Sequence, residues 1–552
     1  MSPVVSRRHA TGVALCVFML CGADAGSVTP IETGERLYRH GILPSGEPLR
    51  ATVGQDVMLR GARAACANCH RRSGYGGIEG SRVVPPITAQ HLFGDPPLSN
   101  ASQRARRTGV DSTTARSFYD SASFRRALRE GRHLSGRPLS APMPQYALAD
   151  SDIDFLIAYL KTLSVPPPGV SASEIHFASI VTEGVPETQR QALLGVVDAF
   201  VRQQNMERRA PKKIDPRAQL GHERVYRAAQ QWRVHVWELK GSADSWPRQM
   251  DRYYREQPVY AVLGGVGRGD WREIHRHCER LALPCLFPNV DLAELSEHDN
   301  FSIYFTRGVI QEAEVLAQAL IQQQGDAARR IVQVYRAHNS GVQAARALRR
   351  ALAGAPQIEI RDLVLPEDDT DYTRFWESLP TDEQAVIVLW LRDQDLARLP
   401  GTFRPDVPLI ISDSLLDDPM CALPVPLRSR THALVLRELP AAWQDRRERM
   451  EAWLRTQGLA LTDERIQGNT YLMLTLVSRV LTHMRENLSR EYLIERIEHQ
   501  AQTASWVSIY PDLSLAPGQR VASRGGYRAA LQADGSLPAS AQWIVPGLLQ
   551  SE

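Results

Sequence analysis

Lysine is nearly absent from this sequence: only four of its 65 basic residues are Lys, and the others are Arg. The bias is typical of a GC-rich bacterial genome. A net charge of only +3 over 552 residues argues against a nucleic-acid partner, which would require a strongly basic face. No apolar stretch, the N-terminal run included, reaches the ~20 residues needed to span a bilayer. Cysteine is also scarce, with seven residues. What is present, 43% hydrophobic and 23% charged residues, indicates a globular protein of several domains.

The N-terminus has the pattern of a secretory signal peptide. Arg7 and Arg8 precede an apolar run over 10–23, and Ala23 and Ala25 frame an A-x-A cleavage site. We therefore predict that residues 1–25 are removed, leaving an exported protein without a membrane span. For a bacterial chain the expected location is the periplasm. A membrane anchor is the alternative, but the run is short for one.

A proline-rich stretch at 164–173 predicts a linker between two domains. The segment before it, 26–163, carries more basic than acidic residues, is loop-rich, and has its clearest helical pattern at 149–163. In the segment after it, 174–552, β-branched runs alternate with amphipathic helical patterns. This alternation predicts βαβ units and parallel sheets. The fold class expected is a small all-α domain followed by a large α/β domain.

The motif Cys66-Ala-Asn-Cys69-His70 has the C-x-x-C-H spacing of a covalent haem attachment site. Two thioether bonds would hold the porphyrin where the adjacent imidazole can bind the iron. A zinc half-site would need a second Cys/His pair at similar spacing, and a thioredoxin-type pair would need a βαβ context. The motif occurs once, which predicts one haem c.

Met143 is the leading candidate for the second axial ligand of the iron. It lies between Pro142 and Pro144, which stiffen the loop, and a thioether ligand favours ferrous iron. His133, His40 and Met58 are the competing ligands, and an iron with an open position is a further alternative.

Residues ~33–165 resemble a class I c-type cytochrome. The likeness rests on the opening helix with Gly34 and Tyr38, the haem motif, and the closing Met143-Pro-x-Tyr146 followed by a helix. The resemblance implies a helical haem domain that transfers single electrons. The ~25 residues between the opening helix and Cys66 depart from the family pattern.

Residues ~174–530 resemble a type I periplasmic binding protein of the leucine/amide-binding family, which serves ABC transporters. The resemblance implies two α/β lobes around a cleft for a small molecule. Members that bind amino acids carry a Ser or Thr in the loop that corresponds to 264–270, whereas this chain has none there. The candidate cleft residues are Gly265, Arg268, Asp270, Asn289, Asp291 and Ser412. Cys278 and Cys285 are a candidate disulfide in an oxidising compartment, with two buried thiols as the alternative.

The combined expectation is a periplasmic monohaem cytochrome fused to a domain that binds a small organic ligand or docks a redox partner. A quinoprotein dehydrogenase or another cytochrome would be such a partner. Two other functions remain open. One is a transport or sensory receptor with an auxiliary haem, which would work with an ABC permease. The other is a haem enzyme of the peroxidase kind, but this needs an open iron position, so we expect no enzymatic activity.

Overall fold

A computed structural model of the chain describes residues 29–54, 56–79, 82–94, 118–209, 230–322, 330–367, 372–379, 385–400, 403, 407–417, 423–484, 487–504 and 506–547. The predicted signal peptide lies outside these residues. The chain divides into two units, the first comprising Met1–Cys69 with Ser117–Thr162 and the second His70–Arg116 with Leu163–Glu552. The second unit resumes at Leu163, beside the predicted linker.

The first unit is built on two crossing helices, α1 (Pro30–His40) and α6 (Asp150–Thr162). Thr29 caps α1, and its hydroxyl accepts the backbone N–H of Glu32 at 3.2 Å. The helices cross closely because Gly34 has no side chain: a Cβ there would lie 2.1 Å from the carbonyl oxygen of Phe155. A third helix, α5 (Ser121–Glu130), begins at an Asp120 cap.

The first unit also contains a sheet, so the expectation of an all-α small domain is wrong. Strands β1 (Arg50–Val53), β2 (Val57–Arg60) and β5 (Gln145–Tyr146) pair antiparallel in the order β2-β1-β5. The β1–β2 hairpin falls within the ~25 residues that depart from the cytochrome pattern. A β-branched residue stands on each side of the turn, Val53 and Val57, which pair with each other. A short 3-10 helix (Gly61–Ala64) follows, and after it come Cys66 and α2 (Ala67–His70), which contains the rest of the haem motif.

The segment that follows the motif, 70–94, belongs to the second unit. It contains the hairpin β3 (Gly77–Glu79) and β4 (Arg82–Val84) and the short helix α3 (Ala89–Leu92). This segment contacts α18 (Arg490–Gln500). The backbone N–H of Ser73 donates to the carboxylate of Glu495 at 2.9 Å, and the rings of Tyr75 and Tyr492 stack at 4.5 Å. The chain next to the haem motif is therefore anchored on the large domain.

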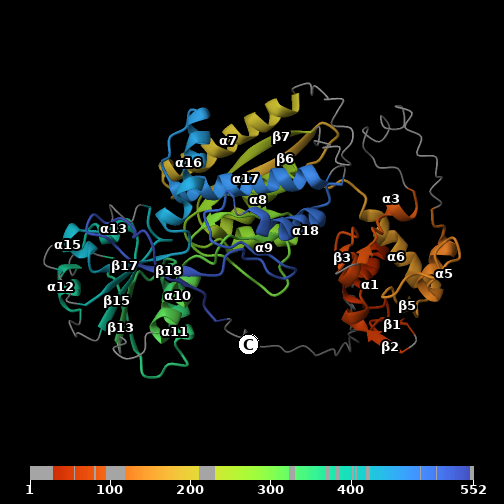
Figure 1. Cartoon of the computed structure of the whole chain (residues 1–552), viewed down its shortest axis with the longest axis horizontal. Coiled ribbons are helices and arrows are strands. Elements are labelled where there is room, and N and C mark those ends of the chain that lie inside the picture. The colour runs from red at the N-terminus through yellow and green to blue at the C-terminus, as the bar shows by residue number, and fades with distance from the viewer. Residues whose placement is uncertain are drawn as a thin grey trace, which may run out of the picture. The chain divides into compact units, whose positions relative to one another are not determined.

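The first lobe of the second unit contains a parallel sheet in the order β11-β9-β6-β8-β10-β12, with β7 paired to β6. Helices cover both faces, as Figure 1 shows for α7 and α17 on one side and α8 and α9 on the other. Successive residues of β6 point to opposite faces of the sheet. Phe177 packs in the core on the side of α7 and α17, and Ala178 packs in the core on the side of α8 and α9. The strands are β6 (Glu174–Thr182), β7 (Gln231–Leu239), β8 (Ala261–Leu263), β9 (Val266–Gly267), β10 (Cys285–Leu286), β11 (Asn289–Val290) and β12 (Ser302–Ile303). The helices are α7 (Glu187–Arg209), α8 (Trp246–Glu256), α9 (Arg272–Arg280), α16 (Pro440–Thr456), α17 (Glu464–Met484) and α18, with 3-10 turns at Ala243–Ser245 and Ala501–Ala504.

The second lobe has a sheet in the order β14-β13-β15-β16-β17-β18-β19, parallel as far as β17 and antiparallel beyond it. Its two cores lie on opposite faces, one with α10 and α11 and one with α12, α13 and α15. The strands are β13 (Arg330–Tyr335), β14 (Glu359–Val364), β15 (Ala385–Trp390), β16 (Leu409–Ser412), β17 (Thr431–Val435), β18 (Gly526–Ala530) and β19 (Trp543–Ile544). The helices are α10 (Val309–Gln322), α11 (Gly341–Ala351), α12 (Tyr372–Glu377), α13 (Asp393–Leu396) and α15 (Val425–Arg428).

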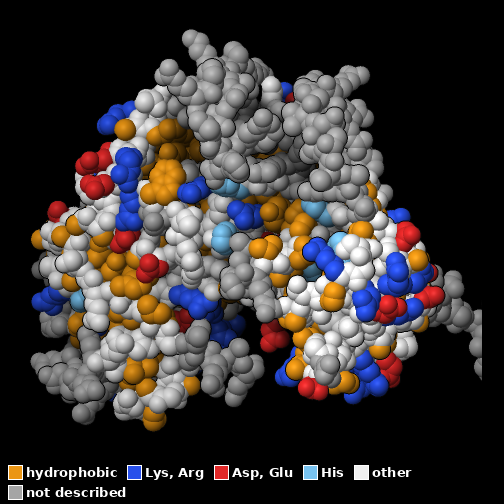
Figure 2. Space-filling model, turned by 45° about the vertical axis from the view of Figure 1, so that its right-hand side comes forward, with side chains coloured by type: hydrophobic (Ala, Val, Ile, Leu, Met, Phe, Trp, Pro, Cys, Tyr) orange, Lys and Arg blue, Asp and Glu red, His pale blue; other side chains and the backbone are white. Residues whose placement is uncertain are grey.

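The chain passes between the two lobes after β12, after β17 and before β18. Loops from both lobes therefore meet where the strands end. No helix in the described part of the chain combines the length and apolar character needed to cross a membrane. On the face drawn in Figure 2, Lys and Arg side chains lie intermixed with Asp and Glu.

Candidate functional site

The two cysteines of the haem motif lie on and just before α2, at the end of the first unit. The side chain of Asn68, between them, donates to the carbonyl of Ala62 at 2.8 Å and fixes the turn. The hydroxyl of Tyr146 hydrogen-bonds the Cys66 sulfur. Burial raises the pKa of the Cys66 thiol to about 11, although the Tyr146 hydrogen bond lowers it.

His70 is 6% exposed, and its Nδ1 lies 3.0 Å from the carbonyl oxygen of Pro85. A carbonyl can only accept, so Nδ1 carries the proton and the neutral ring has its lone pair on Nε2. That tautomer presents Nε2 as a ligand for iron, and the Pro85 hydrogen bond holds the orientation of the ring.

Met143 lies in the turn that precedes β5, with its backbone N–H 3.2 Å from the carbonyl of Ser140. Tyr146, three residues later, pairs with Ala51 in the sheet and reaches Cys66. The sheet that was not expected thus brings the Met143 loop to the cysteine end of the motif. The role of Met143 as an iron ligand stays a prediction.

The residues present fit a covalently attached haem. Cys66 and Cys69 supply the two thiols, both only partly buried, and His70 supplies an imidazole of fixed tautomer. Bound haem would supply a one-electron ferric/ferrous couple. This chain contributes the two attachment thiols and the orientation of His70 through the Pro85 carbonyl.

The second candidate site is a cavity of about 60 Å³ between the two lobes, which has room for a few water molecules. Three of the predicted cleft residues line it: Arg268, Asn289 and Asp291. They follow β9 or belong to β11 and its end, where a parallel sheet places its ligand-binding loops.

The other three predicted residues are not among those that line the cavity. Asp270 accepts the backbone N–H of Arg272 at 2.8 Å and so stabilises the start of α9. Ser412 is fully buried and donates to the carboxylate of Glu312. Gly265 has a φ of 129°, and a Cβ there would lie 3.1 Å from the Trp271 ring, so it shapes the loop rather than binding.

Several polar residues that line the cavity were not predicted. Most follow strands, as Arg392 follows β15 and Arg437 follows β17, so the rule that ligands meet the carboxyl ends of strands would have found them. Arg465 and Asn469 lie on α17, which the chain forms after it returns from the second lobe to the first. Their place at the cavity is therefore evident only from the three-dimensional structure. The unpredicted polar residues are Gln189, Thr306, Arg392, Asp413, Ser414, Asp417, Arg437, Arg465, Asn469 and Tyr510.

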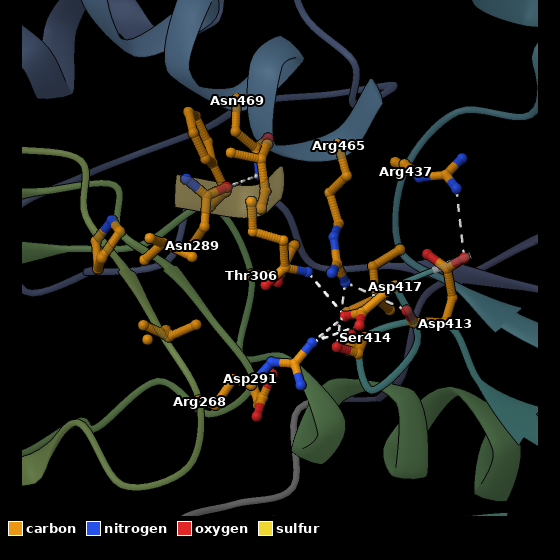
Figure 3. A pocket seen from close by; sticks show the side chains of 18 of the residues that line it. Arg268, Asn289, Asp291, Thr306, Asp413, Ser414, Asp417, Arg437, Arg465 and Asn469 are labelled. Carbon is orange, nitrogen blue, oxygen red and sulfur yellow. Dashed lines mark hydrogen bonds and ion pairs between the residues drawn. The ribbon is translucent and has the colours of Figure 1, made fainter. Parts of the chain in front are cut away.

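Ion pairs join the lobes across the cavity. Arg268 of the first lobe reaches Asp417 of the second with 2.5 Å between Nη2 and Oδ2, and Arg392 of the second lobe pairs with Asp291 of the first. Figure 3 shows Arg465 extending from α17 toward the loop that carries Ser414 and Asp417, which Arg268 approaches from another side. The lobes are closed on each other by these contacts.

Arg465 is the central cation of the cavity. Its guanidinium donates to the carbonyls of Asp413 at 3.2 Å and Ser414 at 3.1 Å. Burial lowers the pKa of Arg465, but the carboxylates of Asp463, Asp413 and Asp291 outweigh this and raise its pKa. Arg465 therefore stays charged, and it balances the acidic groups that face it.

An uncharged network lies at the other end of the cavity. The Tyr510 hydroxyl donates to Oδ1 of Asn469 at 2.9 Å, and Nδ2 of Asn469 donates to Oδ1 of Asn289 at 2.9 Å. Charged groups at one end and amides at the other could orient a small polar molecule that carries a charge.

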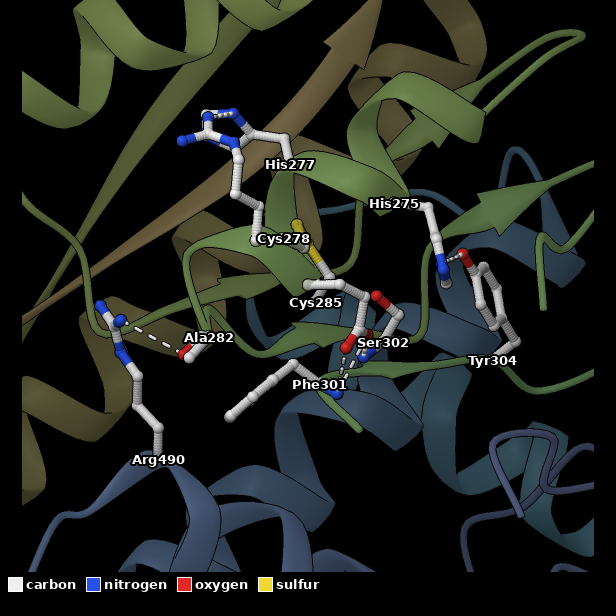
Figure 4. The surroundings of a disulfide bond; sticks show 11 residues. His275, His277, Cys278, Ala282, Cys285, Phe301, Ser302, Tyr304 and Arg490 are labelled. Carbon is white, nitrogen blue, oxygen red and sulfur yellow. Dashed lines mark hydrogen bonds between the residues drawn. A yellow bond between two sulfur atoms is a disulfide. The ribbon is translucent and has the colours of Figure 1, made fainter. Parts of the chain in front are cut away.

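Cys278 and Cys285 form a disulfide between α9 and β10 (Figure 4). Nearby, His275, Glu279 and Asp299 bring their polar atoms within 4.8 Å of one another. Glu279 accepts the backbone N–H groups of Asn300, Phe301 and Ser302. The cluster therefore already has a structural role, fastening the loop before β12.

The comparisons with known proteins concern the two parts separately. Residues 61–164, which include both motif cysteines, His70 and Met143, match the family model of cytochrome c. That match implies haem c. No curated protein matches the sequence.

Solved structures show the fold of the larger part. An ABC transporter substrate-binding protein from Aeropyrum pernix has a TM-score of 0.51 at 14% identity, covering 68% of this chain and 97% of that one. A fatty acid ABC transporter substrate-binding protein from Thermomonospora curvata has a TM-score of 0.50 at 15% identity, covering 68% and 94%. The branched-chain amino acid transporter protein LivJ from Streptococcus pneumoniae, in complex with isoleucine, has a TM-score of 0.50 at 10% identity, covering 68% and 100%. The resemblance stated from the sequence is confirmed: a cytochrome c domain is joined to the fold of a type I periplasmic binding protein.

Proposed function

We propose that this protein is an exported, periplasmic electron carrier with one haem c, fused to a domain that binds a small organic molecule or docks a redox partner. The observation that carries the proposal is the haem motif, in which the Pro85 carbonyl fixes the tautomer of His70 and Tyr146 hydrogen-bonds Cys66. In this proposal Met143 closes the iron coordination, and the protein has no catalytic activity of its own. A quinoprotein dehydrogenase or another cytochrome would exchange the electron.

The haem part is tested by expressing the full chain with the cytochrome maturation system and assaying covalent haem as the pyridine haemochrome. We expect one haem per chain, and none in a Cys66→Ser, Cys69→Ser double variant. Unmodified protein without covalent haem would exclude electron transfer by this site.

For the binding domain, we propose that the cavity receives a small polar solute whose charge is met by the arginine and aspartate side chains. Supporting this are the paired charges around Arg465 and the amide network of Asn289 and Asn469. Ion pairs join the two lobes across the cavity, so in this proposal the solute enters from an opened state.

A thermal-shift screen of the haem-loaded full chain against amino acids, amides and small carboxylic acids tests this. We expect at least one compound to raise the unfolding temperature, and Asn289→Ala to remove the shift. Asp270→Asn is the matched control, because Asp270 is not among the lining residues and its substitution should leave the shift in place. A broad library without any shift would favour docking of a partner.

A transport or sensory receptor is the second candidate, favoured by the fold shared with substrate-binding proteins. The two functions differ in what the solute does to the haem. If binding leaves the reduction potential unchanged and an ABC permease takes up the same solute, the receptor function holds and the haem is auxiliary.

A further inference from the structure

The charged side chains around the inter-lobe cavity pair off unequally. Four arginines and three aspartates line it, and every one of these aspartates is paired with an arginine. The pairs, drawn in part in Figure 3, are Arg268–Asp417, Arg392–Asp291 and Arg437–Asp413. The fourth arginine, Arg465, forms no contact ion pair with a carboxylate of the described residues. One cation of the cavity is therefore left without a counter-charge in contact.

The hydrogen bonds of Arg465 go to neutral acceptors. Nη1 donates to the carbonyls of Asp413 at 3.2 Å and Ser414 at 3.1 Å, and Nη2 donates to that of Leu416 at 3.4 Å. The Nε–H has no acceptor among the residues that the structure describes. Nε and Nη2 lie along one edge of the planar guanidinium, where two parallel N–H groups can bind both oxygens of a carboxylate. This edge is the side of Arg465 that the protein uses least.

The carboxylates that act on Arg465 from farther away are engaged elsewhere. Asp463 accepts the backbone N–H of Ile466 through Oδ1 at 2.8 Å and so satisfies the first turn of α17. Asp413 and Asp291 have the arginine partners given above. These groups help to keep Arg465 charged, but none of them occupies the place of a bound anion.

We propose that the solute of this cavity is a small monocarboxylate without an ammonium group, and that Arg465 binds its carboxylate; this rests on the solute-binding function proposed above. An anion is favoured because it meets a guanidinium without a carboxylate partner, whereas the lining carboxylates already have partners. The ammonium of an amino acid would have to separate one of those ion pairs or stay unpaired, and an unpaired charge inside a protein is costly. A neutral hydroxyl or carbonyl group would instead meet the amides of Asn289 and Asn469.

Arg465 also links the solute to closure of the lobes. It lies on α17 in the first lobe, and its carbonyl partners follow β16 in the second. In an opened state these bonds are absent, so an entering carboxylate meets a guanidinium whose N–H groups are free. Closure then returns Nη1 to the carbonyls of Asp413 and Ser414, while Nε and Nη2 keep the carboxylate.

Matched solutes test the charge class on the unsubstituted, haem-loaded full chain. The probes are glycolate, lactate and the hydroxy-acid analogue of leucine, each compared with its amide and with the amino acid of the same skeleton. We expect at least one hydroxy acid to raise the unfolding temperature, because a ligand that binds only the folded state stabilises it. Its amide, its amino acid, and sodium chloride at equal ionic strength should leave the unfolding temperature unchanged.

The outcomes separate this inference from the solute-binding function on which it rests. An amide or amino acid that binds as well as its hydroxy acid overturns the monocarboxylate assignment and leaves the cavity a solute site. No shift with any compound of the three classes overturns both.

Titration calorimetry with the hydroxy acid that binds then tests the residue. We expect Arg465→Gln to weaken its binding about tenfold or more, because the carboxylate loses its charged partner. Arg465→Lys should bind with intermediate affinity, since an ammonium keeps the charge but lacks the two-pronged geometry. Arg479→Gln is the matched control, because Arg479 lies exposed on the same helix and should leave the affinity unchanged. Unchanged affinity in Arg465→Gln would overturn the assignment of Arg465.

Discussion

At the scale of single residues, Met143 is the predicted second axial ligand of the proposed haem iron. We expect Met143→Ala to convert a low-spin iron to high spin and to lower the reduction potential, because a thioether ligand stabilises ferrous iron. Visible spectroscopy and a redox titration measure both effects. Met58→Ala is the control, since Met58 lies on β2 of the same unit but is 72% exposed. A low-spin spectrum that survives in Met143→Ala would instead assign the ligand to another residue.

Arg268 is a residue-scale determinant of how firmly the lobes close. Its pair with Asp417 is partly exposed, with 25% and 38% of the two side chains accessible, so the pair is worth at most about 1 kcal/mol of stability. We expect Arg268→Ala to leave the unfolding temperature nearly unchanged but to populate an open form with a larger radius of gyration in X-ray scattering.

The control for this experiment is Arg190→Ala. Arg190 pairs with Glu238 at 2.7 Å, both in the first lobe and with similar exposure, so its loss should not alter the scattering. Equal radii for Arg268→Ala and the unsubstituted protein would show that Arg392 and Arg465 suffice to close the lobes.

At the scale of elements, α10 carries a buried carboxyl, Glu312, whose ionisation opposes folding. Burial raises the pKa of Glu312 to about 7, although hydrogen bonds from Ser412 and Ser414 lower it. The folded state thus holds the proton more tightly than the unfolded state, whose carboxyl has its ordinary pKa near 4.5. The contribution of Glu312 to stability therefore falls as pH rises from about 4.5 to 7 and is constant above that range.

We expect Glu312→Gln to remove this decline. Denaturant unfolding at pH 5 and pH 8 should give a smaller difference in free energy for the variant than for the unsubstituted protein. Glu314→Gln is the control on the same helix, where Glu314 pairs with Arg307 at 2.7 Å near the surface. An unchanged pH dependence in Glu312→Gln would show that the decline in stability does not come from Glu312.

Whether the sequence pattern predicts a helix or strand depends on how that element is buried. The β-branched run at 175–180 predicts a strand and the amphipathic pattern at 187–204 predicts a helix. They correspond to β6 and α7, because β6 is buried on both faces and α7 has a continuous apolar side. Strand β14 was missed because it is an edge strand of exposed and half-buried residues. Residues 469–498 have a helical pattern throughout, yet α17 ends at Met484 and a separate helix, α18, begins after Ser489, which caps it through the N–H of Tyr492.

How much of each site the sequence predicts depends on whether its residues are neighbours in the chain. The haem motif is local in sequence, so spacing alone identified Cys66, Cys69 and His70. The inter-lobe cavity is assembled from loops far apart in the chain. The partners of Arg268 and Asp291 are 149 and 101 residues away, and they emerge only when the lobes close.

At the scale of the whole molecule, the segment after His70 is fastened to the large domain by α18. Glu495 accepts from both the N–H and the hydroxyl of Ser73, while Tyr492 stacks on Tyr75 at 4.5 Å. An aromatic pair contributes about 0.5–1.5 kcal/mol beyond its buried area, so its removal should loosen the segment without unfolding the domain. We therefore expect Tyr492→Ala to increase hydrogen exchange at the amides of residues 73–79.

The matched control is Tyr253→Ala. Tyr253 also lies on a helix of the large domain, α8, and stacks on Trp237 with ring centroids 5.9 Å apart, but it does not contact the segment after the haem motif. Its substitution should cost comparable stability and leave exchange at 73–79 unchanged, so general destabilisation is separated from loss of the anchor. If both variants expose 73–79 equally, the segment is held by the global stability of the fold. If only Tyr492→Ala does so, α18 is the element through which the large domain holds the chain beside the haem ligand, since Ser73 is three residues from His70.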